Sequence, residues 1–211
     1  DQRMSRGLGD VYKRQNLMEQ NGGRVSYRSN NTDTPEPYEI NITLFDAMKE
    51  SFNKEVNLYL ERFICIHAIM LSLEGVPAFY IHSLFGTRND YALYKQTNQN
   101  RSLNRGKIKI SEIDLSNESE PQSYIFLQLK KLMHIRKKQP AFHPNAVQFT
   151  LHLGRNLYGI WRQSLDKKQS IFCISNLTEK EVKLSLLDLN LIGFDNWIDL
   201  ITAVSYTHLR A

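Results

Sequence analysis

An apolar run of strand length, Val76–Ser83, constrains the fold of this chain more than any other feature, because it directly follows a helical pattern. The helical pattern covers Asn53–Leu73 and is followed by Gly75 and Pro77, the usual signals that end a helix. The run itself is apolar on both faces, as a parallel strand covered by helices requires. A helix followed by such a strand is one unit of an α/β barrel, so we expect barrel architecture here.

The rest of the chain after this unit divides into a polar connection, a second helix and a β-rich end. Residues 84–120 are polar and lack sustained periodicity, which is typical of functional or disordered loops. After Pro121, apolar residues at helical spacing predict a helix that ends near Lys138. From Val147 the period changes to two, which predicts a small antiparallel β-sandwich domain. Its five expected strands are Val147–Leu151, Leu157–Arg162, Ser170–Ser175, Glu181–Leu186 and Trp197–Leu200.

Short elements are expected in the first fifty residues. A helical remnant covers Asn16–Gln20, and a turn signal separates it from a strand at Arg24–Arg28. Polar residues make Ser29–Pro37 a loop. Alternation and β-branched residues predict an extended segment at Tyr38–Thr43, and a helix is expected to begin within Phe45–Lys49.

Both ends of the chain look foreign to the rest, since they resemble translated adaptor sequence joined to the ends of environmental reads. We therefore expect non-native tails at 1–15 and 204–211, the C-terminal part of a barrel at 16–142, and a β domain at 143–203. Without the tails, Lys plus Arg falls from 27 to 22 and Asp plus Glu from 22 to 20, so the net charge falls from +5 to +2.

Composition indicates a globular protein, with 41% hydrophobic and 23% charged residues. The longest apolar run, Phe63–Leu73, is shorter than the roughly 20 residues of a membrane span, and the first fifteen residues have no apolar stretch of the kind a secretory signal needs. Lys and Arg are scattered, so nucleic acid is not an expected partner. The densest basic group, Lys130–Lys131 with Arg136–Lys138, is expected on a solvated helix face.

Two cysteines, Cys65 and Cys173, lie in apolar segments and lack the spacing of metal ligands. We expect free buried thiols, as in a reducing cytoplasm, and neither a metal site nor a cofactor.

Three segments resemble parts of one superfamily. Gly75–Leu84 looks like its eighth barrel strand with the preceding Gly-x-Pro turn, Leu129–Phe142 resembles its final barrel helix, and Trp197–Leu200 resembles the closing strand of its β domain. This is the α-amylase superfamily, glycoside hydrolase family 13. The resemblance implies a fold made of the C-terminal part of a (β/α)8 TIM barrel followed by the β domain.

Two further motifs are more specific. Gly86–Asp90 followed by Asn98–Arg105 is similar to the eighth-strand loop of sucrose phosphorylases and their relatives. Pro37–Thr43 with Phe45–Asp46 resembles the loop before the seventh-strand region of the same group. The resemblance, which covers about Asn16–Ala203, implies a fragment of a retaining phosphorylase that transfers glucosyl from sucrose, glucosylglycerate or glucosylglycerol to inorganic phosphate.

Catalysis in that group needs carboxylates that this chain does not match. The resemblance implies that the nucleophile, the acid/base and the stabilising Asp all precede the segment homologous to Asn16. We therefore assign no catalytic residue and expect the chain alone to be inactive. The acids Glu36 and Asp46 are interpreted as loop residues or as partners of other side chains.

Four residues are candidates for substrate binding through the resemblance: Arg101, Tyr38, Glu39 and Asp90. Arg101 matches an Arg that holds a glucose hydroxyl, and a guanidinium can donate two hydrogen bonds to neighbouring hydroxyls; the alternative is an Arg that ties the loop to the barrel rim. Tyr38 and Glu39 match acceptor-facing positions, and Glu39 stands where sucrose-specific members carry Gln. Asp90 could pair with Arg101 or Arg105, in a structural or a functional role.

Other residues near these motifs are interpreted as structural. Asn104 and Arg105 are expected to order the loop, His67 to lie in the core, and His82 to lie either in the core or close to the pocket. Two alternatives to a phosphorylase stay open: an α-glucosidase or transglucosidase of the same superfamily, and a non-catalytic carbohydrate-binding relative.

Overall fold

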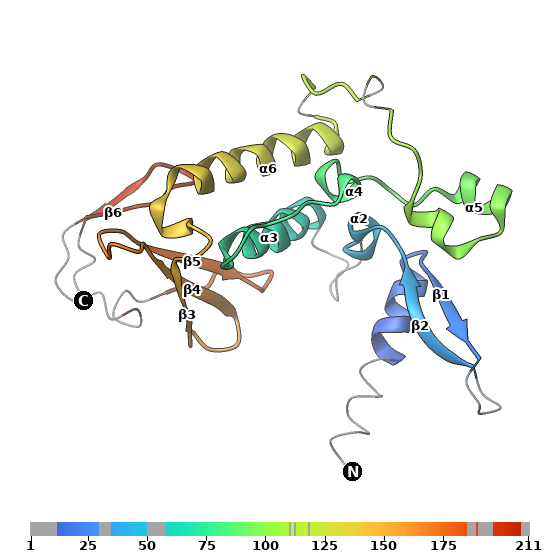
Figure 1. Ribbon diagram of the computed structural model, residues 1–211, viewed down its shortest axis with the longest axis horizontal. Helices are drawn as coiled ribbons and strands as arrows, with labels where there is room; N and C mark the ends of the chain where they lie inside the picture. Colours follow the sequence, from blue (N-terminus) through green and yellow to red (C-terminus); the bar gives the residue numbers. More distant parts are fainter. Residues whose placement is uncertain are drawn as a thin grey trace, which may run out of the picture. The chain divides into compact units, whose positions relative to one another are not determined.

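The computed structural model describes residues 12–29, 35–49, 58–109, 111, 113–117, 119–184, 189 and 196–207. The chain divides into two compact units (Figure 1). Unit 1 comprises Asp1–Phe63 and Phe79–Leu127, and unit 2 comprises Ile64–Ala78 and Gln128–Ala211. Two long helices each contribute to both units, and the expected domain boundary at 142/143 stays a prediction.

Unit 1 combines a β-hairpin with short helices. A helical stretch at 12–20 leads into strands that pair antiparallel, with an irregularity between Ser26 and Tyr27. The further elements are β1 (Arg24–Arg28), β2 (Glu36–Asn41), α2 (Leu44–Ala47), the start of α3 (Tyr59–Ser72), α4 (Ile81–Leu84), α5 (Tyr91–Thr97), η1 (Asn100–Asn104) and the start of α6 (Pro121–Lys138).

The core of unit 1 is built from aromatic rings. Phe45, only 2% exposed, stacks on Tyr59 with ring centroids 4.3 Å apart and meets Phe63 edge-on at 5.2 Å. Phe85 stacks on Phe126 at 5.3 Å. Such contacts contribute beyond the area they bury, by about 0.5–1.5 kcal/mol each.

The expectations for the start of the chain are confirmed in part where the structure describes it. β1 has the predicted bounds. β2 ends at Asn41, within the extended segment predicted at Tyr38–Thr43, but begins at Glu36, within the predicted loop, and α2 begins at Leu44, one residue before the expected helix. The helix at 12–20 includes residues assigned to the tail, and Gln15 donates a hydrogen bond to the Tyr27 hydroxyl at 2.6 Å. Residues 1–11 and 208–211 lie outside the described part, and their foreign origin stays a prediction.

The prediction of a buried parallel strand at Val76–Ser83 is wrong for the described structure. Val76 is 81% exposed and Tyr80 54% exposed, and α4 begins at Ile81. A barrel strand is held by hydrogen bonds to strands on both sides, and no strand of the described residues pairs with this segment. The barrel is therefore not closed here, although Gly75 has the positive φ of 84° that the predicted helix stop requires.

Residues 84–120, expected to be without regular structure, contain α5 and η1. The Asp90 carboxylate caps α5 by accepting a hydrogen bond from the Leu93 N–H at 2.8 Å, and Asn98 ends it in the left-handed conformation. A helix of seven residues is too short to show a period in the sequence, so its stability depends on these caps.

Unit 2 contains a small antiparallel sheet of order β3-β4-β5 and a separate hairpin of β6 and β7 (Figure 1). Its elements after α6, whose predicted end at Lys138 is confirmed, are η3 (Pro140–Phe142), β3 (Val147–Leu151), β4 (Leu157–Gln163), β5 (Ser170–Asn176), β6 (Asn196–Ile198) and β7 (Ser205–Thr207). The first three predicted strands are confirmed. The strand predicted at Glu181–Leu186 is wrong for 181–184, and its last two residues lie outside the described part. The described strands form small sheets instead of a five-stranded sandwich.

Two buried guanidinium groups hold the C-terminal end of α3 in unit 2. Arg136 donates to the carbonyls of Leu71, Leu73 (3.2 Å) and Gly75 (2.9 Å). Arg162, which is 0% exposed, donates to the carbonyl of Ser72 at 3.1 Å. Positive charge at a helix C-terminus interacts favourably with the helix dipole, and these donors satisfy carbonyls that the helix leaves free.

These two arginines share further contacts. Arg162 also donates to the carbonyls of His143 (3.0 Å) and Ala146 (3.4 Å). Both guanidinium groups lie over the ring of Phe142, at 5.1 Å for Arg136 and 5.8 Å for Arg162. Burial lowers the pKa of both groups from their ordinary value, and the nearby charge of Arg162 adds to the lowering for Arg136.

The prediction that the basic group of α6 is exposed to solvent is confirmed for its lysines but not for its arginine. Lys130, Lys131, Lys137 and Lys138 are exposed, whereas Arg136 is 9% exposed. The prediction is wrong for Arg136 because its partners are carbonyls of another segment, which no charge pattern in the sequence indicates.

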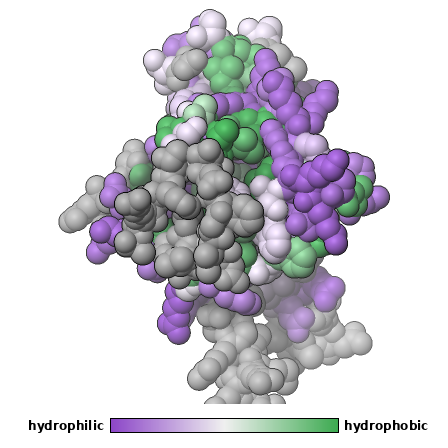
Figure 2. All heavy atoms as spheres, turned by 90° about the vertical axis from the view of Figure 1, so that its left-hand side faces the viewer, coloured by the Kyte–Doolittle hydropathy of each residue, from purple (hydrophilic) through white to green (hydrophobic). Residues whose placement is uncertain are grey.

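A cavity of about 730 Å³ lies within unit 2 between α3, α6, β5 and the segment around β6. Its apolar lining includes Leu71, Leu132, Ile135, Phe172 and Trp197. Figure 2, which faces the left-hand side of Figure 1, shows hydrophobic surface in green among polar surface. The described residues of this unit therefore leave apolar side chains around an open space.

Both cysteines are free, as predicted, and half-buried. Burial raises the pKa of the Cys65 thiol, and it raises the pKa of the Cys173 thiol to about 11. Among the described helices, none is both long and apolar enough to cross a bilayer.

Replacing Arg162 by Ala in the 211-residue chain is expected to lower the free energy of unfolding of unit 2 by about 2–4 kcal/mol, because buried carbonyls lose their donor and a void is left. Urea unfolding followed by tryptophan fluorescence measures this, since both tryptophans, Trp161 and Trp197, lie in unit 2. The control is Lys137→Ala, which changes an exposed side chain and should shift stability by no more than about 0.5 kcal/mol. Equal stability of the two variants would contradict the stabilising role of Arg162.

Candidate functional site

The two motifs that resemble sucrose phosphorylases are joined in unit 1 by a reciprocal pair of buried hydrogen bonds. The Thr43 N–H donates to the side-chain oxygen of Asn89 at 2.8 Å, and the Asn89 N–H donates to the Asp46 carboxylate at 2.6 Å. Thr43 and Asp46 are each 4% exposed and Asn89 is 8% exposed. The segment around β2 and the loop after α4 are therefore fixed to one another.

The Asn89 side chain extends this network to the first turn of the unit. Its amide donates to the Tyr91 hydroxyl at 3.3 Å, which in turn donates to the Gly22 carbonyl at 3.2 Å. Gly22 has a φ of 88°, and a Cβ atom there would lie 2.0 Å from the Tyr91 oxygen. Only glycine combines that backbone conformation with so close a contact.

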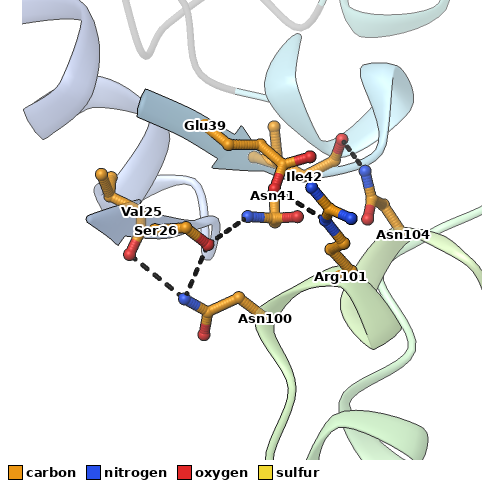
Figure 3. A network of polar contacts seen from close by, with 8 residues as sticks. All are labelled: Val25, Ser26, Glu39, Asn41, Ile42, Asn100, Arg101 and Asn104. Atoms are coloured by element: carbon orange, nitrogen blue, oxygen red, sulfur yellow. Dashed lines mark hydrogen bonds and ion pairs between the residues drawn. The ribbon is translucent and has the colours of Figure 1, made fainter. Parts of the chain in front are cut away.

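A second set of amide contacts holds η1 against the β-hairpin (Figure 3). The Asn100 amide nitrogen donates to the Val25 carbonyl and to the Ser26 hydroxyl, each at 3.2 Å. The Asn41 amide donates to the same hydroxyl at 3.0 Å, and Asn41 is only 1% exposed. The Asn100 bonds hold the residue directly before Arg101 against the hairpin.

Arg101 and Glu39 form an ion pair at this junction. The Arg101 Nε donates to the Glu39 carboxylate at 2.9 Å, with 52% of the Arg101 side chain and 28% of the Glu39 side chain exposed (Figure 3). The hydrogen bond and charge of Glu39 raise the pKa of Arg101 above its ordinary value, with a smaller contribution from Tyr38. Tyr38 is 51% exposed. Three of the four predicted site residues are thus brought together at an accessible position.

The fourth predicted residue, Asp90, makes its contacts with other residues than this ion pair. Besides capping α5, it donates its backbone N–H to the Leu103 carbonyl at 2.7 Å. A Cβ atom on Gly106 would lie 2.7 Å from the Asp90 carboxylate, so the loop packs closely around it. Among the described residues Asp90 pairs with neither Arg101 nor Arg105. These contacts are structural, and a binding role for Asp90 stays a prediction.

The residues interpreted as structural make contacts within the described structure. The Asn104 amide donates to the Ile42 carbonyl at 3.5 Å, which agrees with a role in ordering the loop. His82 is 8% exposed, its Nδ1 lies 2.7 Å from the Thr87 hydroxyl, and burial lowers its pKa. His67 is 3% exposed and lies in the core, as predicted.

Sequence reasoning missed the linking role of Asp46 and Asn89. Asp46 belongs to one of the two motifs and Asn89 to the other. A polar residue in each motif was therefore the one sequence feature that could have indicated a contact between them. Asp46 also influences the core, because burial and the charge of Asp46 raise the pKa of the Tyr59 hydroxyl, while Arg88 opposes the increase. Within the described ranges, no group of three or more His, Cys, Asp or Glu residues could hold a metal ion.

Comparison with known proteins places this arrangement in context. No family model matches the chain. A glucosylglycerate phosphorylase from Allomeiothermus silvanus is 36% identical over 176 residues, which is 82% of this chain and 31% of the relative. A glucosylglycerate phosphorylase from Escherichia coli is 39% identical over 132 residues, or 61% of this chain and 23% of the relative. A sucrose phosphorylase from Agrobacterium vitis is 29% identical over 106 residues, or 50% of this chain and 19% of the relative.

One solved structure shares the fold. The crystal structure of sucrose 6F-phosphate phosphorylase from Thermoanaerobacter thermosaccharolyticum matches with a TM-score of 0.60 and 23% identity, over 76% of this chain and 30% of that chain. The described residues thus correspond to part of that α/β fold, with small antiparallel sheets and no closed barrel.

The chain is related to glycoside hydrolase family 13. Within it, the chain is homologous to the glucosylglycerate and sucrose phosphorylases, as its motifs predicted. The chain spans about 31% of the length of the Allomeiothermus silvanus relative.

Replacing Asn89 by Ala is expected to loosen the junction between the two motifs, because the buried Thr43 N–H loses its acceptor and the Tyr91 hydroxyl loses a donor, at a cost of about 1–3 kcal/mol for the buried group. Hydrogen exchange should show the Thr43 amide exchanging at least about tenfold faster, the effect of about 1.4 kcal/mol. Gln96→Ala, an exposed change on α5, is the control. Unchanged protection of Thr43 would show that Asn89 does not hold the motifs together.

Proposed function

We propose that this chain is the C-terminal part of a retaining glucoside phosphorylase that transfers a glucosyl group to inorganic phosphate. The observation that carries the proposal is the junction of the two motifs, which sets Arg101, Glu39 and Tyr38 at one accessible position. The homology to glucosylglycerate phosphorylases supports the same activity.

Glucosylglycerate is the first substrate that we propose. The relatives named as glucosylglycerate phosphorylases are 36% and 39% identical to the chain, against 29% for the sucrose phosphorylase. Glu39 supports the same choice, because the resemblance gives Gln at this position in sucrose-specific members. Sucrose and glucosylglycerol are the next candidates.

In this proposal the chain supplies binding groups and the rest of the protein supplies the reacting carboxylates. A retaining enzyme uses a nucleophile and an acid/base about 5–5.5 Å apart, and phosphate then resolves the glucosyl-enzyme. We assign these carboxylates to the portion of the relatives that the chain does not span. Arg101 would donate hydrogen bonds to glucose hydroxyls, and Tyr38 and Glu39 would face the acceptor.

A cytoplasmic location is part of the proposal, since the substrate includes free phosphate and both thiols are free.

The full-length protein should form α-glucose 1-phosphate from glucosylglycerate and phosphate, because double displacement retains the anomeric configuration. Phosphorus NMR measures the product and its configuration. The 211-residue chain, assayed in parallel, should show no turnover. Rapid release of glucose without phosphate would instead indicate a glucosidase, and absence of any turnover by the full-length protein would indicate a non-catalytic relative.

A further inference from the structure

The first turn of unit 1, Asn21–Gly23, contains the pair of residues in this chain that is most prone to spontaneous deamidation. Asn21 precedes Gly22, and no other asparagine of the sequence precedes a glycine. Asparagine is a chemically labile residue. A glycine after it has no side chain to hinder attack of the backbone nitrogen on the carboxamide. The turn therefore carries a nucleophile and an electrophile on neighbouring residues.

The electrophile, the carboxamide of Asn21, is buried and bonded to α2. Asn21 is 4% exposed, and its Nδ2 donates a hydrogen bond to the Ala47 carbonyl at 3.1 Å. Within the described part of the chain, its Oδ1 is buried without a hydrogen-bond partner. The bond to Ala47 therefore limits rotation of the carboxamide, and burial keeps water away from it.

The nucleophile, the backbone nitrogen of Gly22, is held by hydrogen bonds on both sides. Its N–H donates to the Glu19 carbonyl at 2.9 Å, so the proton that must leave during attack is already bonded. The Gly22 carbonyl accepts from the Tyr91 hydroxyl at 3.2 Å, and the Gly23 N–H donates to the Met18 carbonyl at 2.7 Å. Ring closure needs a rotation of the backbone between Asn21 and Gly22, and that rotation would break these bonds.

We propose that Asn21 is a latent modification site that deamidates only when the contacts of the first turn with Ala47 and Tyr91 open. In the open turn, the Gly22 nitrogen forms a bond to the Asn21 Cγ and the bond from Cγ to Nδ2 breaks. The proton of the Gly22 amide leaves with Nδ2 as ammonia, and a succinimide ring remains.

Water completes the reaction by opening the ring. Its oxygen bonds to one of the two ring carbonyl carbons, the bond from that carbon to the ring nitrogen breaks, and a proton of the water returns to the nitrogen. Attack at Cγ gives aspartate at position 21, and attack at the main-chain carbonyl carbon gives isoaspartate.

Either product prevents the first turn from closing again. A carboxylate has no hydrogen to donate, so the bond to the Ala47 carbonyl is lost, and closure would bury a charge against that carbonyl. Isoaspartate also adds a methylene group to the backbone before Gly22. That backbone has no room to shift toward Tyr91, since a Cβ atom on Gly22 would lie 2.0 Å from the Tyr91 oxygen. The modification therefore records each opening of the turn irreversibly.

The test incubates the 211-residue chain at mildly alkaline pH and follows its tryptic peptide Gln15–Arg24 by liquid chromatography and mass spectrometry, which separates the isoaspartate, aspartate and asparagine forms. The folded chain should deamidate at least about a hundredfold more slowly than the chain in urea, because the population of the open turn limits the rate. Tyr91→Phe, which removes the donor to the Gly22 carbonyl, should accelerate the reaction of the folded chain about fivefold.

The matched control is Tyr94→Phe, which removes a hydroxyl from the same helix, α5, and keeps the ring that lies under Arg24. It should leave the rate unchanged. Hydrogen exchange in the wild-type chain provides a measurement that needs no variant. Protection of the Gly22 amide from exchange should match protection of Asn21 from deamidation within about threefold, because one opening exposes both groups.

Two results would overturn the inference. One is equal deamidation in the folded chain and in urea. The other is a Gly22 amide that stays protected from exchange while Asn21 reacts at the rate of the chain in urea. Equal rates for Tyr91→Phe and Tyr94→Phe would remove Tyr91 from the proposal and contradict it as stated. None of these measurements depends on phosphorolysis, so their outcome is separate from that of the proposed function.

Discussion

The candidate site depends on one reciprocal contact, in which Asn89 accepts from the Thr43 N–H and donates its own N–H to Asp46. All three residues are buried, so water cannot replace a lost partner, and each unmade bond would cost about 1–3 kcal/mol. Because the two bonds join segments more than forty residues apart, they determine which surfaces of the hairpin and of the loop face each other. The amide contacts of Asn100 with the hairpin then hold η1 beside β2, where Arg101 and Glu39 form their exposed ion pair.

Unit 2 is also stabilised by buried polar groups, in this case by two arginines that bond to backbone carbonyls. Arg136 and Arg162 are buried cations whose hydrogen-bond partners among the described residues are backbone carbonyls, chiefly at the C-terminal end of α3. The negative end of the helix dipole and the ring of Phe142 compensate charges that would otherwise be costly to desolvate. In each unit, then, polar groups that look like surface residues in the sequence are satisfied inside the structure.

The sequence predicted those features that depend on local pattern. The bounds of β1 and the end of α6 at Lys138 follow from periodicity and stop signals, and the sequence contains both loop motifs but does not indicate the contact between them. The prediction for Val76–Ser83 is wrong because apolar residues on both faces favour a buried strand only where neighbouring strands pair with it. No strand of the described residues pairs with this segment. The burial of Arg136 could not be predicted, since its acceptors are carbonyls, which every residue has.

In the proposed function, Arg101 donates hydrogen bonds to a glucosyl ring while Glu39 holds its Nε. A crystal structure of the full-length protein with bound glucose tests this most directly. We expect glucose hydroxyls within about 2.7–3.2 Å of the Arg101 Nη atoms, with the bond from Nε to Glu39 still in place. Glucose bound away from Arg101, or an Arg101 side chain turned off Glu39 to reach its ligand, would contradict the account.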